Sequence, residues 1–191
     1  MDPPGYTRRE LVTTVGTGLS IAVTGCLGGG SDATPTPDLP FERRIDPSRT
    51  YLRTQSDDAG DAQPIDLSAL AVAAGQSIRI ERVGSFSGSS SGTGLTAVFS
   101  GSDRLESSDV TERVPDAIDA GEDYETSPTY NGEAPTDIPE DFLIADNEGD
   151  QTSVTVTIPD GATHLFVAAI DNFYQDNSPG DPPLAVRITS P

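Results

Sequence analysis

Cysteine, histidine and lysine are scarce or absent in this chain of 191 residues. It contains one cysteine, Cys26, and one histidine, His164, and all eleven basic residues are arginine. A single cysteine excludes a disulfide framework, and one cysteine with one histidine is too few for a zinc site. A Ser-His-Asp triad would depend on His164, which begins an apolar segment and is expected to be a strand-end residue. We therefore expect no enzyme activity.

Acidic residues dominate the charge that is present. The chain carries 31 Asp and Glu against 11 Arg, a formal net charge of -20 at pH 7. Nucleic-acid binding needs basic patches that neutralise phosphates, so this balance argues strongly against it. An acidic chain without lysine resembles the proteins of extreme halophiles, in which molar salt screens carboxylate repulsion over a Debye length of about 3 Å. Most carboxylates are therefore expected to face solvent.

The N-terminal segment resembles an export signal. Residues 7–12 (TRRELV) contain Arg8 and Arg9 and resemble the twin-arginine motif, and an uncharged stretch follows over residues 11–25. The alternative is a short transmembrane anchor. That stretch is fifteen residues long and contains several Gly and Thr, whereas a helix needs roughly 20 apolar residues to span hydrocarbon. We therefore expect export by the twin-arginine (Tat) machinery.

A lipid-attachment motif ends this signal. Residues 23–26 (VTGC) resemble a lipobox, in which small side chains beside the scissile bond admit a peptidase and the cysteine thiol carries a thioether-linked lipid. Residues 1–25 would then be a signal peptide and Cys26 the first residue of the mature chain. Together with the acidic composition, the signal is similar to those of haloarchaeal surface lipoproteins. It implies a location at the extracellular face of the cell membrane.

The rest of the chain divides into a linker and one domain. Residues 26–50 are rich in Gly, Pro and Thr, a composition that does not pack a core and would project a domain from the membrane. Residues 51–191 suffice for one domain with a single core.

Hydrophobic periodicity in this domain predicts strands. Alternation of apolar and polar residues is typical of half-buried strands, and short runs that are apolar throughout are typical of strands covered on both faces. A disordered acidic chain, the competing interpretation, would not require such periodicity. The fold class is therefore all-β, an antiparallel two-sheet β-sandwich. Half-buried strands are expected at residues 77–81, 153–158 and 184–188, and covered strands at residues 95–99 and 165–170.

Three other segments have weaker patterns. Residues 65–72 predict a further strand, and residues 114–120 predict a helix of one or two turns. Residues 102–151 form a long acidic stretch that predicts loops over the sandwich, with a short strand at residues 141–145. Two interpretations of this stretch stay open: functional loops, or an insertion that only solvates the surface.

Oxygen-bearing side chains gather between the last two predicted strands. Residues 171–180 (DNFYQDNSPG) contain Asp171, Asp176 and Asn177, and a turn through Phe173 can present its carbonyl. Calcium takes about six to eight oxygen ligands of these kinds. Asp and Asn also form turns without binding metal, so a purely hydrogen-bonded turn is the alternative.

The same segment resembles the terminal hairpin of the calcium-dependent, galactose-binding bacterial lectins of the galactophilic lectin A type, which are small jelly-roll-like sandwiches. Their pattern is an apolar strand, Asp, a short loop, Tyr, one residue, then Asn-Asn-Ser-Gly and a last strand. This chain departs from it in a shorter loop, an Asp for the first Asn, and an inserted Pro179. The residues that fall on the pattern are Asp171, Tyr174, Asp176, Asn177, Ser178 and Gly180.

A second segment is similar to an early strand and loop of the same lectins. It covers residues 75–88, and the position whose backbone carbonyl binds the metal in the family corresponds to Gly88. The family has a Tyr at that position, so the ring contact with a sugar would be missing here.

The resemblance implies a galactose-binding-like sandwich in which calcium is coordinated by the protein and by sugar hydroxyls. The side-chain ligands would be Asp171, Asp176 and Asn177, with the carbonyls of Gly88 and Phe173 as weaker candidates. The ligand-binding residues would be Tyr174, Asp176 and Asn177.

Two functional hypotheses follow. The first is a lipid-anchored surface module that binds a glycan through calcium. The alternative is a non-catalytic structural or interaction lipoprotein of the cell envelope with no sugar or metal site. A transporter's solute-binding receptor is disfavoured, because such receptors usually need two larger lobes. Carboxylate pairs such as Glu140 with Asp141 are expected from composition alone, with 31 acids in the chain.

The anchor hypothesis makes a direct prediction. Replacing Cys26 by Ser removes the thiol that would carry the lipid, so the Cys26→Ser protein should leave the membrane fraction and appear in the medium. Replacing Arg8 and Arg9 by Lys should leave the protein inside the cell. Immunoblots of cell, membrane and medium fractions measure both effects. A Cys26→Ser protein that stays with the membrane would contradict the lipobox.

Overall fold

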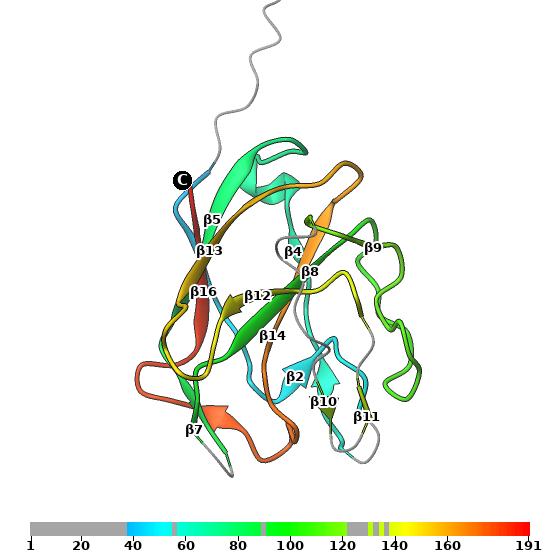
Figure 1. The fold of residues 1–191 in the computed structure, drawn as a ribbon, viewed down its shortest axis with the longest axis vertical. Helices are drawn as coiled ribbons and strands as arrows, with labels where there is room; N and C mark the ends of the chain where they lie inside the picture. Colours follow the sequence, from blue (N-terminus) through cyan, green and yellow to red (C-terminus); the bar gives the residue numbers. More distant parts are fainter. Residues whose placement is uncertain (1–37, 55–56, 89–90, 122–129, 132–133, 136–137) are drawn as a thin grey trace, which may run out of the picture. The chain divides into compact units, whose positions relative to one another are not determined.

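The structure is a computed structural model that describes residues 38–54, 57–88, 91–121, 130–131, 134–135 and 138–191 (Figure 1). These residues belong to one compact unit, Thr34–Pro191. The predictions on the signal peptide and on Arg8, Arg9 and Cys26 lie outside the described residues.

Almost all regular structure in these ranges is β-strand. One short 3-10 helix, η1, is present, and none of the described helices is long and apolar enough to cross a membrane. The elements are β1 (Phe41–Arg44), β2 (Arg49–Thr50), β3 (Gly60–Asp61), β4 (Ile65–Asp66), η1 (Ser68–Leu70), β5 (Ser77–Val83), β6 (Phe86–Ser87), β7 (Ser91–Gly92), β8 (Leu95–Ser100), β9 (Ala117–Ile118), β10 (Tyr130–Asn131), β11 (Ala134–Pro135), β12 (Phe142–Ala145), β13 (Ser153–Thr157), β14 (His164–Ala169), β15 (Ser178–Pro179) and β16 (Ala185–Thr189).

The first of two large sheets has four antiparallel strands in the order β1-β16-β5-β13. Its register opposes Ile80 of β5 to Ile188 of β16 and to Val154 of β13. Side chains alternate between the two faces of a strand, so Ile78 and Ile80 are buried while Ser77 and Arg79 are exposed. The sheet is thus apolar on one face, as the period-two pattern predicts.

The second sheet is built around β8 and β14. Its order is β12-β8-β14-β4, all antiparallel, and β9 pairs with the end of β8. Leu165 of β14 opposes Phe99 of β8, and Ala169 opposes Leu95. Every residue of β8 is buried, as are all residues of β14 except His164. The predicted strand-end position of His164 is confirmed.

Alternate residues of β8 and β14 point into two different cores. The inner core lies between the two sheets, and the outer core lies on the opposite face of the second sheet. The inner core includes Ile78, Ile80, Val156, Val186 and Ile188 of the first sheet with Leu95, Ala97, Phe99, Phe142, Leu165 and Val167 of the second. The outer core comprises Tyr51, Leu52, Ala62, Val98, Val114, Ile138, Phe166, Ala168 and Tyr174.

These features confirm the all-β class and the antiparallel sheets. The inner core joins the two sheets in the manner of a β-sandwich. The predicted strands at residues 77–81, 95–99, 153–158, 165–170 and 184–188 all correspond to strands of the structure, within one or two residues.

Residues 65–72 do not form the single strand that was predicted. Strand β4 ends at Asp66, because its Oδ1 accepts hydrogen bonds from the backbone N–H of Ser68 (2.8 Å) and from the Ser68 hydroxyl (2.7 Å). Such a turn competes with strand pairing. The chain then forms η1, which ends at Ala71 with φ 53° in the left-handed region.

Residues 114–120 contain a strand rather than the predicted helix. Asp116 has φ 53°, which a continuous right-handed helix does not contain. Ala117 and Ile118 instead pair with Ser100 and Phe99 of β8. The local pattern was outweighed by this pairing with a distant strand.

The domain also begins before the predicted boundary at residue 51. Residues 41–44 lie in the expected linker but form β1, which pairs with β16 from Phe41↔Ile188 to Arg44↔Ala185. Phe41 packs against the inner core, whereas Glu42 and Arg44 are exposed. Two adjacent arginines conceal this alternation in the sequence.

Irregular segments and the short parallel pair β2-β3 cover the outer face of the second sheet. Tyr51 and Leu52 follow β2, Ala62 follows β3, and the acidic stretch 102–151 contributes Val114 and Ile138 to the outer core. The predicted strand at residues 141–145 is present as β12. The described parts of the acidic stretch therefore have a structural role, because their apolar side chains pack in the outer core.

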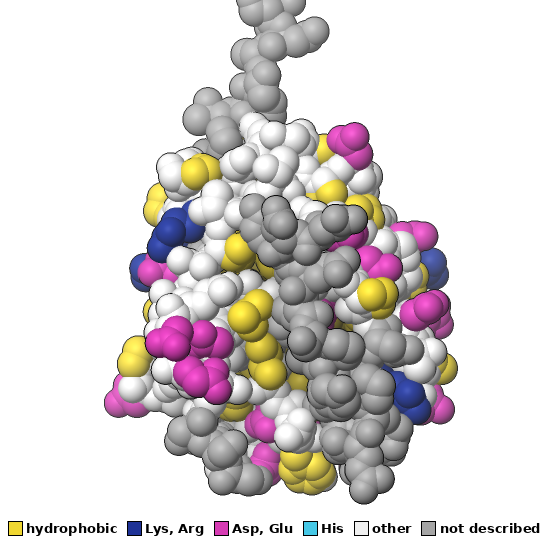
Figure 2. All heavy atoms as spheres, in the orientation of Figure 1, with side chains coloured by type: hydrophobic (Ala, Val, Ile, Leu, Met, Phe, Trp, Pro, Cys, Tyr) yellow, Lys and Arg dark blue, Asp and Glu magenta, His cyan; other side chains and the backbone are white. Residues whose placement is uncertain are grey.

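Most carboxylates in the described ranges face solvent, as predicted. Figure 2 shows Asp and Glu scattered over the visible face with few arginines between them. Two acids of the described part of the chain are buried, Asp57 and Asp141. Asp141 accepts hydrogen bonds from Tyr51 and Thr96 at 3.4 Å each. Burial, together with the nearby charge of Asp141, raises the pKa of Tyr51 well above its usual value.

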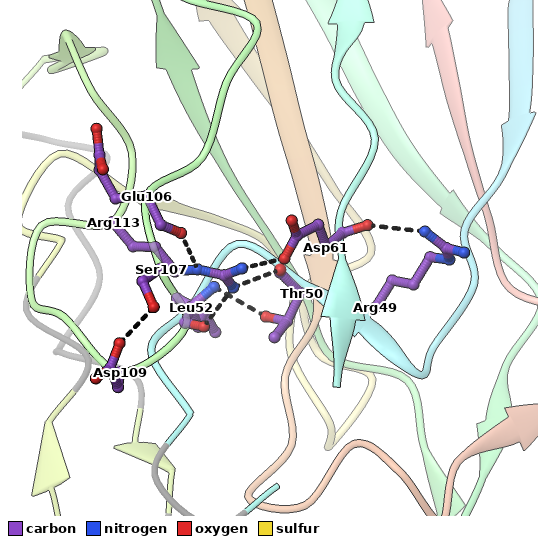
Figure 3. A network of polar contacts seen from close by, with 8 residues as sticks. All are labelled: Arg49, Thr50, Leu52, Asp61, Glu106, Ser107, Asp109 and Arg113. Carbon is purple, nitrogen blue, oxygen red and sulfur yellow. Dashed lines mark hydrogen bonds and ion pairs between the residues drawn. The ribbon is translucent and has the colours of Figure 1, made fainter. Parts of the chain in front are cut away.

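Arg113 fastens the cover loops together (Figure 3). Its side chain is 1% exposed. Its guanidinium donates to the carbonyls of Glu106 (3.0 Å), Thr50 (3.0 Å) and Leu52 (3.2 Å), and its Nη2 forms an ion pair with Asp61. A buried cation is tolerated only when it is paired and hydrogen-bonded. Its partners are Thr50, Leu52 and Asp61 on and beside the β2-β3 pair and Glu106 in the segment after β8, so one side chain joins these two parts of the cover.

Removing this side chain should destabilise the domain. Arg113→Ala leaves three carbonyls without their donor and opens a cavity, so we expect the free energy of unfolding to fall by about 3 kcal/mol. Exposed Arg79 offers a matched control, and Arg79→Ala should change it by less than about 0.5 kcal/mol. Denaturant unfolding followed by circular dichroism measures both. Equal small effects would show that Arg113 does not hold the cover in place.

Candidate binding site beside β6 and β15

The structure joins the two segments that carry the lectin resemblance. Strand β6 lies between β15 and β7 in a three-stranded antiparallel sheet. Ser87 of β6 opposes Ser178 of β15, with their hydroxyls 3.1 Å apart, and Gly180 N–H donates to the Ser85 carbonyl at 2.9 Å. Segments about 90 residues apart in sequence thus form one surface.

Gly88, Asp176 and Asn177 meet at this surface. A Cβ placed on Gly88 would overlap the Asn177 side-chain oxygen Oδ1 and would lie 3.1 Å from the Asp176 oxygen Oδ1. The absence of a side chain at Gly88 therefore leaves room for both oxygens. Three of the five predicted metal ligands are brought together in this way.

Asn177 has an unsatisfied acceptor. Its Oδ1 is buried and receives no hydrogen bond, whereas its Nδ2 donates to the Pro47 carbonyl at 3.2 Å. The backbone N–H of Asn177 closes a turn on the Tyr174 carbonyl at 3.0 Å. A buried polar atom without a partner costs about 1–3 kcal/mol. A cation or a donor from a ligand would remove that cost.

Tyr174, a predicted ligand-binding residue, lies in the outer core. It is 0% exposed, and its hydroxyl donates to the Ala169 carbonyl at 3.2 Å. Burial raises the pKa of the Tyr174 hydroxyl, with smaller contributions from the charges of Asp171 and Asp57. Its ring packs the hairpin onto the second sheet, which favours a structural role.

Asp57 holds the hairpin loop in place, and sequence reasoning missed it. Its carboxylate accepts hydrogen bonds from the backbone N–H groups of Tyr174 and of Gln175, the latter at 3.1 Å. Asp57 is buried and lies 117 residues from Tyr174 in the chain. No local pattern distinguishes it from the other acids of the sequence.

Asp171 and Phe173 occupy other parts of the loop. The Asp171 carboxylate is half-buried and accepts the N–H of Asn172 at 2.6 Å. Phe173 is 38% exposed. In the described ranges, Val110 is the other large apolar side chain that is exposed to solvent. Within those ranges no three Asp, Glu, His or Cys side chains lie together as a metal-binding group. A cation at this surface would depend on Asp176, the Asn177 amide and backbone carbonyls.

These groups are the kinds of oxygen ligand that calcium binds, but they are fewer than a complete calcium shell contains. Carboxylate, amide and carbonyl oxygens are the ligands that Ca²⁺ prefers, and Asp176, Asn177 and Gly88 offer one of each. About six to eight oxygens complete its shell. Water and the hydroxyls of a bound ligand would supply the remainder.

The space at Gly88 can be tested directly. Gly88→Ala should force the Asn177 amide to rotate and break its bond to Pro47, lowering the free energy of unfolding by about 1 kcal/mol. Gly101→Ala is the control, because a Cβ there meets its nearest atoms at 3.5 Å. That variant should be as stable as the parent or slightly more so. Denaturant unfolding compares the two, and equal stabilities would show that Asn177 does not need the space at Gly88.

Comparison with known proteins leaves the family of this chain open. No protein-family model matches it, and neither a curated protein nor a solved structure does. The functional assignment therefore depends on the residues and contacts described above.

Proposed function

We propose that the mature protein is a lipid-anchored module of the cell surface that binds carbohydrate through a calcium ion held by Asp176, Asn177 and the Gly88 carbonyl. The observation that carries this proposal is the buried Asn177 Oδ1, which has no hydrogen-bond donor and lies beside Gly88. The jelly-roll, galactose-binding-like form of the sandwich belongs to the same proposal.

The incomplete ligand set suits a role in recognition. A calcium ion with only a few protein ligands keeps coordination positions for hydroxyl pairs of a sugar. Phe173, exposed in the same loop, adds an apolar surface for the ligand. The loop itself is fixed by Asp57 and Tyr174, so little order has to be gained on binding.

Location is the second part of the proposal. Export through the Tat machinery and lipidation of Cys26 would place the domain at the extracellular face of the membrane, with the segment after Cys26 as a tether. The glycan would then belong to the envelope or the surroundings. The acidic surface keeps such a domain hydrated in concentrated salt.

Calorimetric titration of the detergent-solubilised mature protein tests the site. Calcium should bind at molar salt, and a galactoside should bind only when calcium is present. Asp176→Ala and Asn177→Ala should each weaken calcium binding by about tenfold or more, because each removes a ligand. Asp181→Asn is the matched control, since Asp181 is an exposed acid that follows the same hairpin.

Each outcome is informative. A flat calcium titration of the wild-type protein would contradict the proposal and favour the structural lipoprotein. Calcium binding that Asp181→Asn weakens as much as Asp176→Ala would point to diffuse attraction by the acidic surface. Asp171→Ala distinguishes the lectin pattern, which includes Asp171, from the smaller site proposed above.

A further inference from the structure

A pocket with a volume of about 170 Å³ is lined by residues that the calcium proposal does not use. Its lining comes from β1 and the segment that follows it, from the segment after β3, and from β14. Ile45, Ala62 and Val167 form its apolar part, and Val167 and Ala62 are each 4% exposed. The inner and outer cores therefore reach the surface at this pocket.

Positive charge is concentrated at this pocket, which we name the arginine pocket. Arg43, Arg44 and Arg49 contribute to its lining, and Asp46 is the one acid among the lining residues. The described ranges contain nine arginines, the eleven of the chain less Arg8 and Arg9. A third of them thus gathers at one pocket, in a chain whose net charge is -20. Because acids outnumber arginines in the chain by 31 to 11, a pocket lined by three arginines and one acid is not expected from composition.

Two guanidinium groups flank one wall of the pocket. Arg43 Nη1 donates to the Pro64 carbonyl at 2.7 Å, and Arg49 Nη1 donates to the Asp61 carbonyl at 3.2 Å, as Figure 3 shows for Arg49. These carbonyls lie on either side of residues 62 and 63, which line the pocket. Each of these arginines donates one N–H to a neutral carbonyl. The other N–H groups of the Arg43 guanidinium have no hydrogen-bond partner among the described residues.

The acids near the pocket already have partners, and one of these partners is Arg49 of the pocket itself. The Asp61 carboxylate pairs with buried Arg113. The Asp46 carboxylate accepts from the Ser48 hydroxyl at 2.7 Å and lies 3.4 Å from Arg49 Nε. Arg43 and Arg44 make no ion pair with any described residue, although Arg43 is half-buried. A half-buried cation without a counter-charge is a place where an anion is favoured.

We infer that the arginine pocket binds a small organic carboxylate whose body is about the size of a six-membered ring. Guanidinium groups match a carboxylate in geometry and charge. The apolar part gives the body of the ligand a surface to contact, which a bare inorganic anion would not use. The volume is close to that of engineered cavities of about 150 Å³ that hold benzene. Gln63 adds an amide for a polar substituent.

This site does not depend on the calcium proposal, because the two share no residue. A ring-sized carboxylate has two main sources, an acidic sugar and an aromatic acid, and both present a carboxylate on a ring. The surroundings of a surface-anchored domain can contain either. Glucuronate and benzoate represent them as probes.

The experiment is a calorimetric titration of the detergent-solubilised mature protein at fixed salt, with a chelator present to exclude calcium. At least one of glucuronate and benzoate should bind, and the tighter of the two identifies the source. Glucose lacks the charge and acetate lacks the ring, so each should bind at least about tenfold more weakly. Arg43→Gln and Arg49→Gln should each weaken the tighter probe by about tenfold, because these two guanidinium groups flank the pocket wall.

Arg79→Gln is the matched control, because it removes the same charge from an exposed arginine outside the pocket. It should leave binding unchanged. Arg49 is exposed and both of its contacts lie at the surface, so Arg49→Gln keeps the test valid if Arg43→Gln does not fold. Absence of binding for both probes, equal binding of acetate, or equal effects of Arg49→Gln and Arg79→Gln would each overturn the inference.

Discussion

Burial of β8 and β14 on both faces is the constraint on which the rest of this domain depends. Alternate residues of the two strands enter the inner and outer cores, so a single sheet opposite them would leave half of their apolar surface in water. The first sheet covers one face. The other face needs a second cover, and this chain supplies it mostly from irregular segments, together with the short β2-β3 pair.

A cover made of loops must satisfy its own polar groups. Strands pair their backbone groups with each other, whereas irregular segments need side chains or water to do so. Arg113 serves three carbonyls of the cover, Asp57 serves two N–H groups of the hairpin, and Tyr51 with Thr96 and Asp141 forms a buried polar cluster. The few buried charges of this acidic chain are thus concentrated where regular pairing is absent.

The same fastening positions both candidate sites. Asp57 fixes the turn that carries Asp176 and Asn177. Asp61 contacts two arginines: its carboxylate forms an ion pair with Arg113, and its carbonyl accepts a hydrogen bond from Arg49. Residues 57–61 therefore connect the outer core to the hairpin on one side and to the arginine pocket on the other. Loops that are held this firmly can present ligands with little loss of entropy on binding.

The strands with clear periodicity could be predicted from sequence, because every second residue of a half-buried strand is apolar. Strand β9 and the end of β4 have no such pattern. Ala117 and Ile118 are held by pairing with β8, and Asp66 ends its strand through a turn with Ser68. The hairpin became a candidate site through its closely spaced oxygen-bearing side chains and its resemblance to the lectins. Arg113 and Asp57 could not be, because their roles depend on partners 52 and 117 residues away.

Charge and salt together limit how such a surface can recognise anything. In molar salt, attraction between exposed charges decays over about 3 Å, so the net charge of -20 attracts cations only weakly at longer range. Specific binding must then come from direct contacts in places that solvent ions enter poorly. The buried Asn177 Oδ1 and the half-buried Arg43 guanidinium are two such places, one suited to a cation and the other to an anion. On the two proposals, the exposed acids and these sheltered groups would have separate roles in the same chain: the acids would keep the surface hydrated, and the sheltered groups would select the ligands.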